Sequence, residues 1–442
     1  MSIESAVHWT SAPLGSLGQI RLGKMLDKAK NTGSMVQYLR NVNVRWFQFD
    51  LSDMKSLRLS DAEQEMFSVR DGDVFICEGG EPGRCAVWHG GTNLIVYQKA
   101  LHRFRTSGAI APRFLMYQLR HQAYSGALQK AFSGTTIKHL TRESLSRHDV
   151  TLPPAQEQQL IAAKLDAVLA RVDACRERLD CLPGILKRFR SSVLATATSG
   201  RLTEDWRISR GFSEPIKTTL GAVVRVLSGG FLPAKDMTSG GTVPVFGGNG
   251  INGYHDQGNV TKETVVLGRV GFYCGSVHMT PSTAWVTDNA MIVRHDEAQI
   301  SRRFLYYALQ AIDLRANDAS TAQPLISGQK IYPLVIVVPT VQEQAEIVRR
   351  VDSLFAWADR LEARQAAVRA QVDRLTPSLL AKAFRGELVP QDPADESASE
   401  LLKRLSQQPS ANPTAPAKRQ EPKPHRAKAS QTASNVREES SS

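Results

Sequence analysis

The sequence predicts an α+β fold in which two globular α/β domains are separated by two long antiparallel coiled-coil helices, with a pseudo-twofold internal repeat. Residues 341–388 repeat residues 155–202 without a gap, at a shift of 186 positions that brings Glu343 onto Glu157. Both copies carry a heptad pattern of apolar residues. The stretches before and between the copies are of comparable length and have a different character. The chain therefore alternates domain, helix, domain, helix.

The heptad pattern predicts that the two copies pair. A single helix would leave its apolar stripe in water, because the flanking positions hold Arg, Asp, Glu and Gln. Connectivity requires the pair to be antiparallel, and about 40 helical residues at ~1.5 Å each give a length of roughly 60 Å. Two unrelated surface helices are the alternative. The expected pairing residues are Ile161, Leu165, Val168, Val172, Leu179, Leu186, Ile347, Val351, Leu354, Leu361, Val368 and Val372.

The repeat sets the expected domain boundaries. We expect a first globular domain at 1–152 (head one), a helical spacer at 153–207, a second domain at 208–337 (head two), a second spacer at 338–390 and a disordered tail at 391–442. In head one, Val74–Ile76 and Cys85–Trp88 are expected to be strands and Arg113–Leu119 a helix. In head two, Arg303–Leu309 resembles that helix.

Charge and cysteine content limit the class of protein. The formal net charge is +12, and head one holds 19 Lys and Arg against 13 Asp and Glu, which favours a polyanionic partner over a basic face that serves solubility alone. The five cysteines are scattered, without a disulfide framework or zinc spacing, which is typical of a reducing cytoplasm. No apolar run approaches the ~18 residues of a membrane span, and the first residues do not resemble a secretion signal.

The sequence contains three partial matches to catalytic or cofactor-binding motifs, and each of them lacks an essential feature. Gly18–Lys24 starts like a P-loop, but Met25 replaces the Mg²⁺-binding Ser or Thr. Gly248–Gly253 fits GxGxxG but leads into turn residues and not into a helix. Pro153-Pro154 lacks the Asn or Asp and the aromatic residue of an amino-methyltransferase motif, and the ten histidines show no metal-binding pairs. We therefore expect neither a catalytic residue nor a metal site.

Polar residues in the loops of both heads are the candidates for contact with DNA. Arg pairs with guanine and Asn with adenine in the major groove, and Lys can contact phosphates, although a solvated surface position is the ordinary alternative for any one of them. The candidates are Lys24, Arg40, Asn41, Asn43, Arg45, Arg84 and Lys138 in head one, and Asn249, Asn252, Arg269, Gln329 and Lys330 in head two.

The repeated blocks Pro153-Pro154-Ala155-Gln156-Glu157-Gln158 and Pro339-Thr340-Val341-Gln342-Glu343-Gln344, each followed by a heptad helix ending in Gly-x-Leu, resemble the specificity subunits of type I restriction–modification systems. The stretch 38–44, together with Asp71–Val74 and Gly79-Gly80, is similar to the first target-recognition domain of that family. Head two departs from the pattern at 322–325, where the family has a Gly-Thr-Thr-like turn.

The resemblance implies a non-catalytic, cytoplasmic subunit that binds double-stranded DNA. Each head would recognise one half of a bipartite asymmetric site, and the helices would set the spacer and dock two methyltransferase subunits, which restriction subunits join. S-adenosylmethionine, ATP and Mg²⁺ would be bound by those partners, and the complex would act as an adenine-N6 DNA methyltransferase and ATP-dependent endonuclease.

Two other classes of protein stay open. The first is an enzyme, a DNA methyltransferase or nuclease with fused recognition domains, and the incomplete motifs disfavour it. The second is a coiled-coil scaffold that binds DNA without sequence preference. Two elaborate heads with divergent loops disfavour the scaffold, because contact with the backbone alone does not need them.

Overall fold

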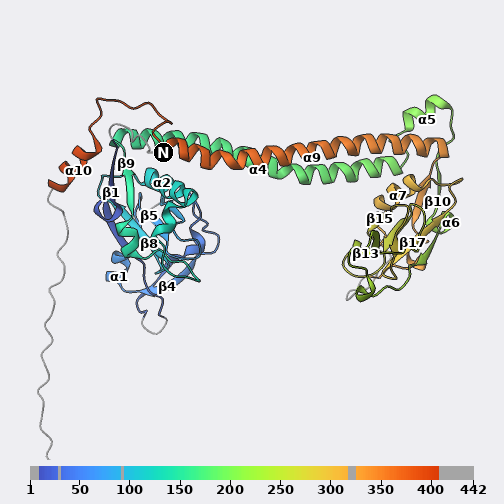
Figure 1. The fold of residues 1–442 in the computed structure, drawn as a ribbon, viewed down its shortest axis with the longest axis horizontal. Helices are drawn as coiled ribbons and strands as arrows, with labels where there is room; N and C mark the ends of the chain where they lie inside the picture. Colours follow the sequence, from blue (N-terminus) through green and yellow to red (C-terminus); the bar gives the residue numbers. More distant parts are fainter. Residues whose placement is uncertain (1–8, 28–30, 91–93, 317–324, 408–442) are drawn as a thin grey trace, which may run out of the picture. The chain divides into compact units, whose positions relative to one another are not determined.

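A computed structural model of the chain describes residues 9–27, 31–90, 94–316 and 325–407 (Figure 1). The chain forms two compact units, Met1–Ile161 with Val389–Ser442, and Ala162–Leu388. Each unit contains one mixed α/β domain. No helix in the described ranges is long and apolar enough to cross a membrane.

The first unit holds nine strands and several short helices in its described part. The strands are β1 (Thr10–Pro13), β2 (Gly18–Leu22), β3 (Ser34–Leu39), β4 (Lys55–Leu59), β5 (Val74–Cys77), β6 (Cys85–Val87), β7 (Ile95–Tyr97), β8 (Leu101–Thr106) and β9 (Asp149–Leu152). The helices are η1 (Leu14–Ser16), η2 (Asn41–Asn43), α1 (Asp61–Met66), α2 (Pro112–Ser125), η3 (Ala127–Ala131), α3 (Arg142–Arg147), the start of α4 (Ala155–Thr198) and α10 (Ala398–Gln407).

The second unit holds the same number of strands in its described part. They are β10 (Ile216–Thr219), β11 (Val224–Ser228), β12 (Val243–Gly247), β13 (Gly250–His255), β14 (Val265–Gly268), β15 (Val277–Met279), β16 (Trp285–Val286), β17 (Ala290–His295) and β18 (Val335–Val338). Besides most of α4, the helices are α5 (Glu204–Arg210), α6 (Leu220–Val223), η4 (Ala234–Asp236), α7 (Arg302–Ala311), α8 (Gly328–Ile331) and α9 (Val341–Ala383). The predicted strands and helices of both heads are present.

The two heads share one topology. Head one has sheets ordered β2-β8-β5-β6, β4-β3-β7 and β1-β9, and head two has β11-β17-β14-β15, β13-β12-β16 and β10-β18. The directions agree as well, since β3 is parallel to β7 and β12 is parallel to β16, whereas the other pairs are antiparallel. The sequence similarity between the heads is weak, so this identity of strand order establishes the repeat more firmly than the sequence does.

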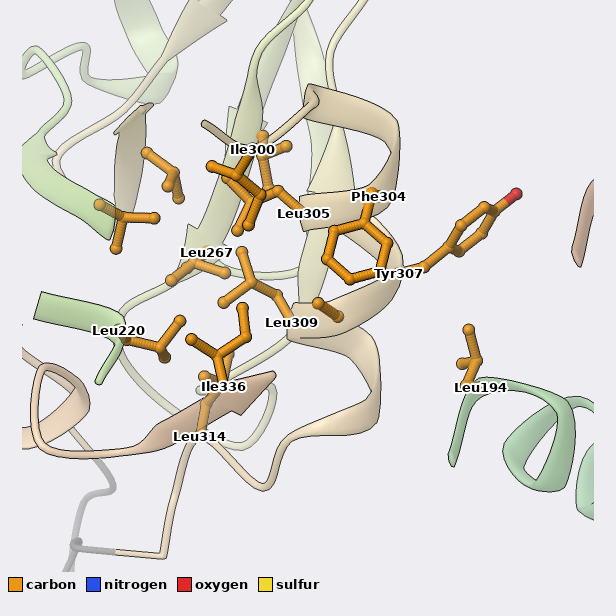
Figure 2. Close-up of a cluster of buried hydrophobic side chains, with 14 of the residues drawn as sticks. Leu194, Leu220, Leu267, Ile300, Phe304, Leu305, Tyr307, Leu309, Leu314 and Ile336 are labelled. Carbon is orange, nitrogen blue, oxygen red and sulfur yellow. The ribbon is translucent and has the colours of Figure 1, made fainter. Parts of the chain in front are cut away.

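Helix α7 closes the core of head two. Its buried face packs against strands and against residues of α8, β18 and the two long helices. Figure 2 shows Phe304, Leu305 and Leu309 of α7 directed toward Leu267 of β14, with Leu194 of α4 at one side of the cluster. The core residues labelled there are Leu194, Leu220, Leu267, Ile300, Phe304, Leu305, Tyr307, Leu309, Leu314 and Ile336.

Within the second unit, α4 and α9 lie side by side and antiparallel (Figure 1). Arg176 donates to Asp373 at 3.1 Å and Arg190 donates to Asp359 at 2.6 Å, so 14 positions forward on α4 correspond to 14 positions back on α9. Each helix is continuous through its proline, Pro183 or Pro377. Every one of the twelve expected pairing residues is buried or half-buried. Two of them, Ile347 and Val351, also belong to the core of head two.

Each long helix is joined to its head by a glutamine at the same position of the repeat. Gln158 is buried, accepts from the Ala111 amide at 2.7 Å and donates to the carbonyls of Ala109 and Pro153. Gln344 accepts from the Ser301 amide at 2.7 Å and donates to the carbonyls of Gln299 and Pro339. In both heads these bonds fix the turn that precedes α2 or α7, which explains why the glutamine recurs in the repeated block.

The expectation of a disordered tail from residue 391 is wrong for Ala398–Gln407, which form α10. Ser397 accepts a hydrogen bond from the amide of Glu400 at the start of this helix. Ala398 and Leu401 are buried, and Glu396 pairs with Arg404 at 2.8 Å. The overall composition of the tail suggested disorder, although residues 398–407 form a short amphipathic helix within it. Residues 408–442 lie outside the described part of the chain.

Candidate nucleic-acid interface

The hairpin loop β5–β6 of head one and the loop β14–β15 of head two are closed by equivalent backbone hydrogen bonds, although the loop of head two is one residue longer. Gly83 donates to the Cys77 carbonyl at 2.9 Å, and Gly275 donates to the Gly268 carbonyl at 2.8 Å. Each loop also has two glycines with positive φ, at 77° and 88° in Gly80 and Gly83, and at 82° and 85° in Gly271 and Gly275. Side chains disfavour this conformation, so both loops need glycine there. The closing hydrogen bonds are shared, whereas the residues between the glycines differ in type and in number.

In head two, three other segments contact this hairpin. Ser276 donates to the Gly248 carbonyl at 2.7 Å, Arg269 Nη1 donates to Ser228 Oγ at 3.4 Å, and the Ile326 amide donates to the Arg269 carbonyl at 3.0 Å. We call these four segments the head-two loop cluster: residues 228–231, 247–252, 268–276 and 325–330. All five residues predicted for head two lie in it.

The head-two loop cluster presents polar and basic side chains to solvent. Asn249, Asn252 and Gln329 are exposed, and Arg269 and Lys330 are half-buried. Lys330 Nζ donates to the Leu325 carbonyl at 2.7 Å. These are the donors and acceptors that contact with base edges and phosphates requires.

Two further residues at this edge were missed by the sequence reasoning. The side chain of Arg315 lies over Gly275, where an added Cβ would be 3.3 Å from Arg315 Cγ. His278 lies against Gly250 and its Nε2 is 3.1 Å from Ser276 Oγ. Burial lowers the pKa of His278, so the ring is neutral at pH 7 and acts through hydrogen bonds and not through charge.

In head one, the β5–β6 loop packs against η2. Arg84 Nη2 donates to the Asn41 carbonyl at 2.9 Å, and a Cβ on Gly80 would be 3.4 Å from Asn41 Nδ2. The structure therefore brings the Arg84 side chain and the backbone of Asn41 together. Lys138 is exposed, and His139 beside it lies 3.3 Å from the position of a Cβ on Gly79. Arg45 is exposed as well, with Asp50 at 3.7 Å.

Three residues proposed for head one are bound by other residues of that head, and one of them, Asn43, is also buried. Asn43 is only 2% exposed, and its side chain accepts from the Arg40 amide and donates to the carbonyls of Asp50 and Asp53. Arg40 donates to Asp53 Oδ2 at 2.8 Å, and Lys24 is paired with Glu63. Residue type and loop position suggested contact with DNA, whereas Asn43 closes the loop 40–53 from inside. We remove Asn43 from the candidate interface.

Head one also contains a basic groove that the sequence reasoning missed. It has a volume of about 860 Å³ and is lined by four arginines: Arg21, Arg70, Arg103 and Arg105. Arg103 is 2% exposed, and Arg105 forms two contacts of 2.7 Å with Asp73. The signal was present in the sequence, since Arg103 and Arg105 alternate on one strand and Arg21 faces Arg103 on β2.

Two kinds of reactive site, a thiol nucleophile and a metal-binding cluster, were considered in the described residues. Burial raises the pKa of the Cys77 thiol to about 11, so it is protonated at neutral pH. No cluster of three or more His, Cys, Asp or Glu with the arrangement of a metal site occurs within 9–27, 31–90, 94–316 and 325–407. The loop surfaces offer groups for binding.

Comparison with protein-family models identifies the family in which this pair of repeated heads and helices occurs. The model described as "Type I restriction modification DNA specificity domain" matches residues 6–180 and 216–368, once for each half of the repeat. The chain belongs to the family of type I restriction–modification specificity subunits. Members of this family are the non-catalytic recognition subunits of their systems, so the chain is not an enzyme by itself.

Individual relatives support this family membership. The type I restriction enzyme EcoKI specificity subunit of Escherichia coli (strain K12) is 31% identical over 329 residues, which are 66% of this chain and 70% of that protein. The StySPI specificity subunit of Salmonella potsdam is 31% identical over 334 residues, 67% of this chain and 71% of that protein.

Solved structures support the fold of the specificity subunit. A chain from a study of complex assembly and conformational transition of the type I R-M system gives a TM-score of 0.63 at 17% identity, covering 87% of this chain and 99% of its own length. The HsdS subunit of Thermoanaerobacter tengcongensis gives 0.54 at 18% identity, covering 87% and 98%. The fold class expected from the repeat, two α/β heads with two long helices, is confirmed.

Proposed function

We propose that this specificity subunit recognises a bipartite, asymmetric site in double-stranded DNA, with one half bound by each head. The observation that carries the proposal is one topology built twice, with the matched β5–β6 and β14–β15 hairpins carrying different residues between their glycines. A constant scaffold with divergent loops is suited to two different sequences. The EcoKI and StySPI relatives are specificity subunits, which supports the same role.

We assign the contacts in head two to Asn249, Asn252, Arg269, Gln329 and Lys330, which the head-two loop cluster brings together. In head one we assign them to Asn41, Arg45, Arg84 and Lys138. In the arginine groove of head one, the exposed Arg70 and the half-buried Arg21 would bind backbone phosphates, because guanidinium groups form strong paired hydrogen bonds with phosphate oxygens. Arg103 is buried and Arg105 is paired with Asp73, so these two would add positive charge without direct contact. Arg40, Lys24 and, among the assigned residues, Arg84 are the weaker candidates, since each is paired with a carboxylate and its side chain is at most 20% exposed.

We further propose roles for the remaining segments and partners. Residues 1–152 and 208–337 would be the two target-recognition domains, and the spacers 153–207 and 338–390 would fix the unread DNA between the half-sites. The helices would dock two methyltransferase subunits that bind S-adenosylmethionine. Restriction subunits that use ATP and Mg²⁺ would then join the complex.

Selection from random-sequence DNA tests this function. The full chain, assembled with its methyltransferase partner, should enrich two short conserved sequences separated by a gap of fixed length. Affinity for the enriched site should fall with salt, with a log–log slope near −0.9 for each phosphate contacted. A continuous consensus, or a flat response to salt, would contradict the proposal.

The scaffold that binds DNA without sequence choice is the alternative, and the same selection separates the two. A scaffold would enrich no consensus and would still show the salt dependence, because backbone contacts alone release counterions. The differing loops on matched hairpins favour the specific subunit over the scaffold.

A further inference from the structure

The tip of the β14–β15 loop in head two carries an exposed aromatic residue. Phe272 is 84% exposed and its neighbour Tyr273 is 51% exposed, with the two rings edge-to-face at a centroid distance of 5.1 Å. Single exposed apolar residues are common on protein surfaces. These two lie in the head-two loop cluster, where Phe231 is also 74% exposed, so the apolar groups gather at the surface that we assign to DNA.

The backbone holds this tip in a defined conformation. Gly271 and Gly275 have φ angles of 82° and 85°, and the amides of Gly268 and Gly275 close the hairpin with bonds of 2.8 Å to the carbonyls of Ser276 and Gly268. Phe272 therefore projects from a hairpin whose two ends are tied, and ordering it on binding costs less conformational entropy than ordering a free loop.

The matched tip in head one is polar and is tied to its own domain. Glu81 accepts from Trp46 Nε1 at 2.5 Å and from Arg84 Nη1 at 3.2 Å, and Arg120 Nη1 is 3.7 Å away. The hairpin of head two is one residue longer and has the ring of Phe272 in solvent at its tip. In head two, the exposed ring of Phe272 is therefore not needed to hold the hairpin to its domain.

We propose that Phe272 inserts as an apolar wedge at a base step of the half-site bound by head two. Arg269 lies at the base of the same hairpin and the side chain of Arg315 lies over Gly275, so cations flank the tip and favour a polyanion over an apolar protein surface. Phenylalanine side chains that enter DNA between bases unstack the step and kink the duplex. Head two would then select a deformable step as well as base edges, whereas head one would not.

The wedge rests on the proposed function, DNA recognition by head two. The test below distinguishes failure of the wedge from failure of that function. The wild-type complex first selects its consensus from random DNA. Duplexes of that consensus then carry 2-aminopurine in place of each adenine of the head-two half-site and its flanks, on either strand and one at a time. Without methyl donor, they are titrated with wild type, Phe272→Ala, Phe272→Leu and the control Ile208→Ala. Ile208 is 69% exposed on α5, outside the head-two loop cluster.

We expect fluorescence to rise at one step that is not the methylated adenine, to fall to the level of free DNA in Phe272→Ala, and to be partly retained in Phe272→Leu. Affinity of Phe272→Ala should fall about tenfold, in the range of one lost stacking contact. Ile208→Ala should match wild type. Unchanged affinity and fluorescence in Phe272→Ala would overturn the wedge while leaving the consensus standing.

Two other outcomes also decide the question. If Phe272→Ala binds DNA normally but assembles less well with the methyltransferase subunit, the tip docks a protein and the wedge is wrong. If the wild-type complex selects no consensus at all, the proposed function fails and the wedge fails with it.

Discussion

Gln365 of α9 donates a hydrogen bond of 3.0 Å to the carbonyl of Leu179 of α4, and the two residues occupy the same position in the two copies of the repeat, 186 residues apart. In an antiparallel pair related by a pseudo-twofold axis, equivalent positions meet only at the axis. This contact therefore marks the centre of the helix pair and shows that the repeat in the sequence is also a symmetry of the α4–α9 pair.

Equal insertions at that centre should change the DNA gap alone. Seven residues added after Leu179 and seven after Gln365 preserve the heptad register on both helices and lengthen each by roughly 10 Å, about three base pairs. We expect the selected half-sites to stay unchanged and the gap between them to lengthen. Seven residues added to α4 alone should destabilise the pair instead. A changed half-site in the double insertion would contradict the spacer role.

Glu343 should be a strong determinant of stability in the second unit. Arg207 Nη1 donates to Glu343 Oε1 at 2.8 Å, and both residues are buried. Burial disfavours the charged guanidinium, but Glu343 and Glu214 outweigh this and leave the pKa of Arg207 above its usual value. Replacing one partner of a buried pair typically costs about 3–5 kcal/mol, so Glu343→Gln should shift denaturant unfolding by that amount.

The control for Glu343 is an exposed ion pair. Arg385 and Glu387 are 2.8 Å apart with both side chains 50% exposed, so Glu387→Gln should leave denaturant unfolding almost unchanged. Equal losses in Glu343→Gln and Glu387→Gln would show that burial of the Arg207–Glu343 pair adds nothing.

Glu346 should make part of the stability depend on pH. The hydrogen bond from Arg349 lowers the pKa of Glu346 to about 2, and Arg350 adds a second bond at 2.7 Å. Because the folded-state pKa lies below the ordinary value of 4.5, the ionised group stabilises the fold above pH 4.5, and this contribution is lost as the pH falls toward 2. Urea unfolding of wild type and Glu346→Gln should differ above pH 4.5 and converge as the pH falls toward 2. A difference that stays constant with pH would refute this.

The long helices were predictable because their pattern is local. Heptad spacing and the repeated Gln-Glu-Gln block are visible in the residues themselves, and the burial of Gln158 and Gln344 explains their recurrence. The candidate site was predictable only in part. Asn43 and Asn41 look alike in the sequence, yet Asn43 closes its loop from inside and Asn41 lies beside Gly80, and such placement depends on contacts made by distant segments. Phe272 was missed because exposure of an aromatic residue leaves no mark in the sequence.

Arg269 should determine part of one half-site only. It is half-buried, its carbonyl is held by Ile326 and its guanidinium contacts Ser228. Arg269→Ala should relax the preference at one or two positions of the head-two half-site, with a loss of about 1–3 kcal/mol of discrimination per base pair. Lys217→Ala, an exposed change on β10, is the control and should leave both half-sites intact. Selection from random DNA measures both, and relaxed preference in the head-one half-site would count against the assignment.

The central claim, that this chain gives its complex a two-part DNA specificity, is tested most directly by a single-molecule map of N6-methyladenine in the host genome. The map should be made with the gene intact, deleted, and carrying Arg269→Ala. We predict a split methylated motif that disappears on deletion and becomes degenerate in one half in the variant. A genome whose methylation is the same in all three strains would contradict the claim.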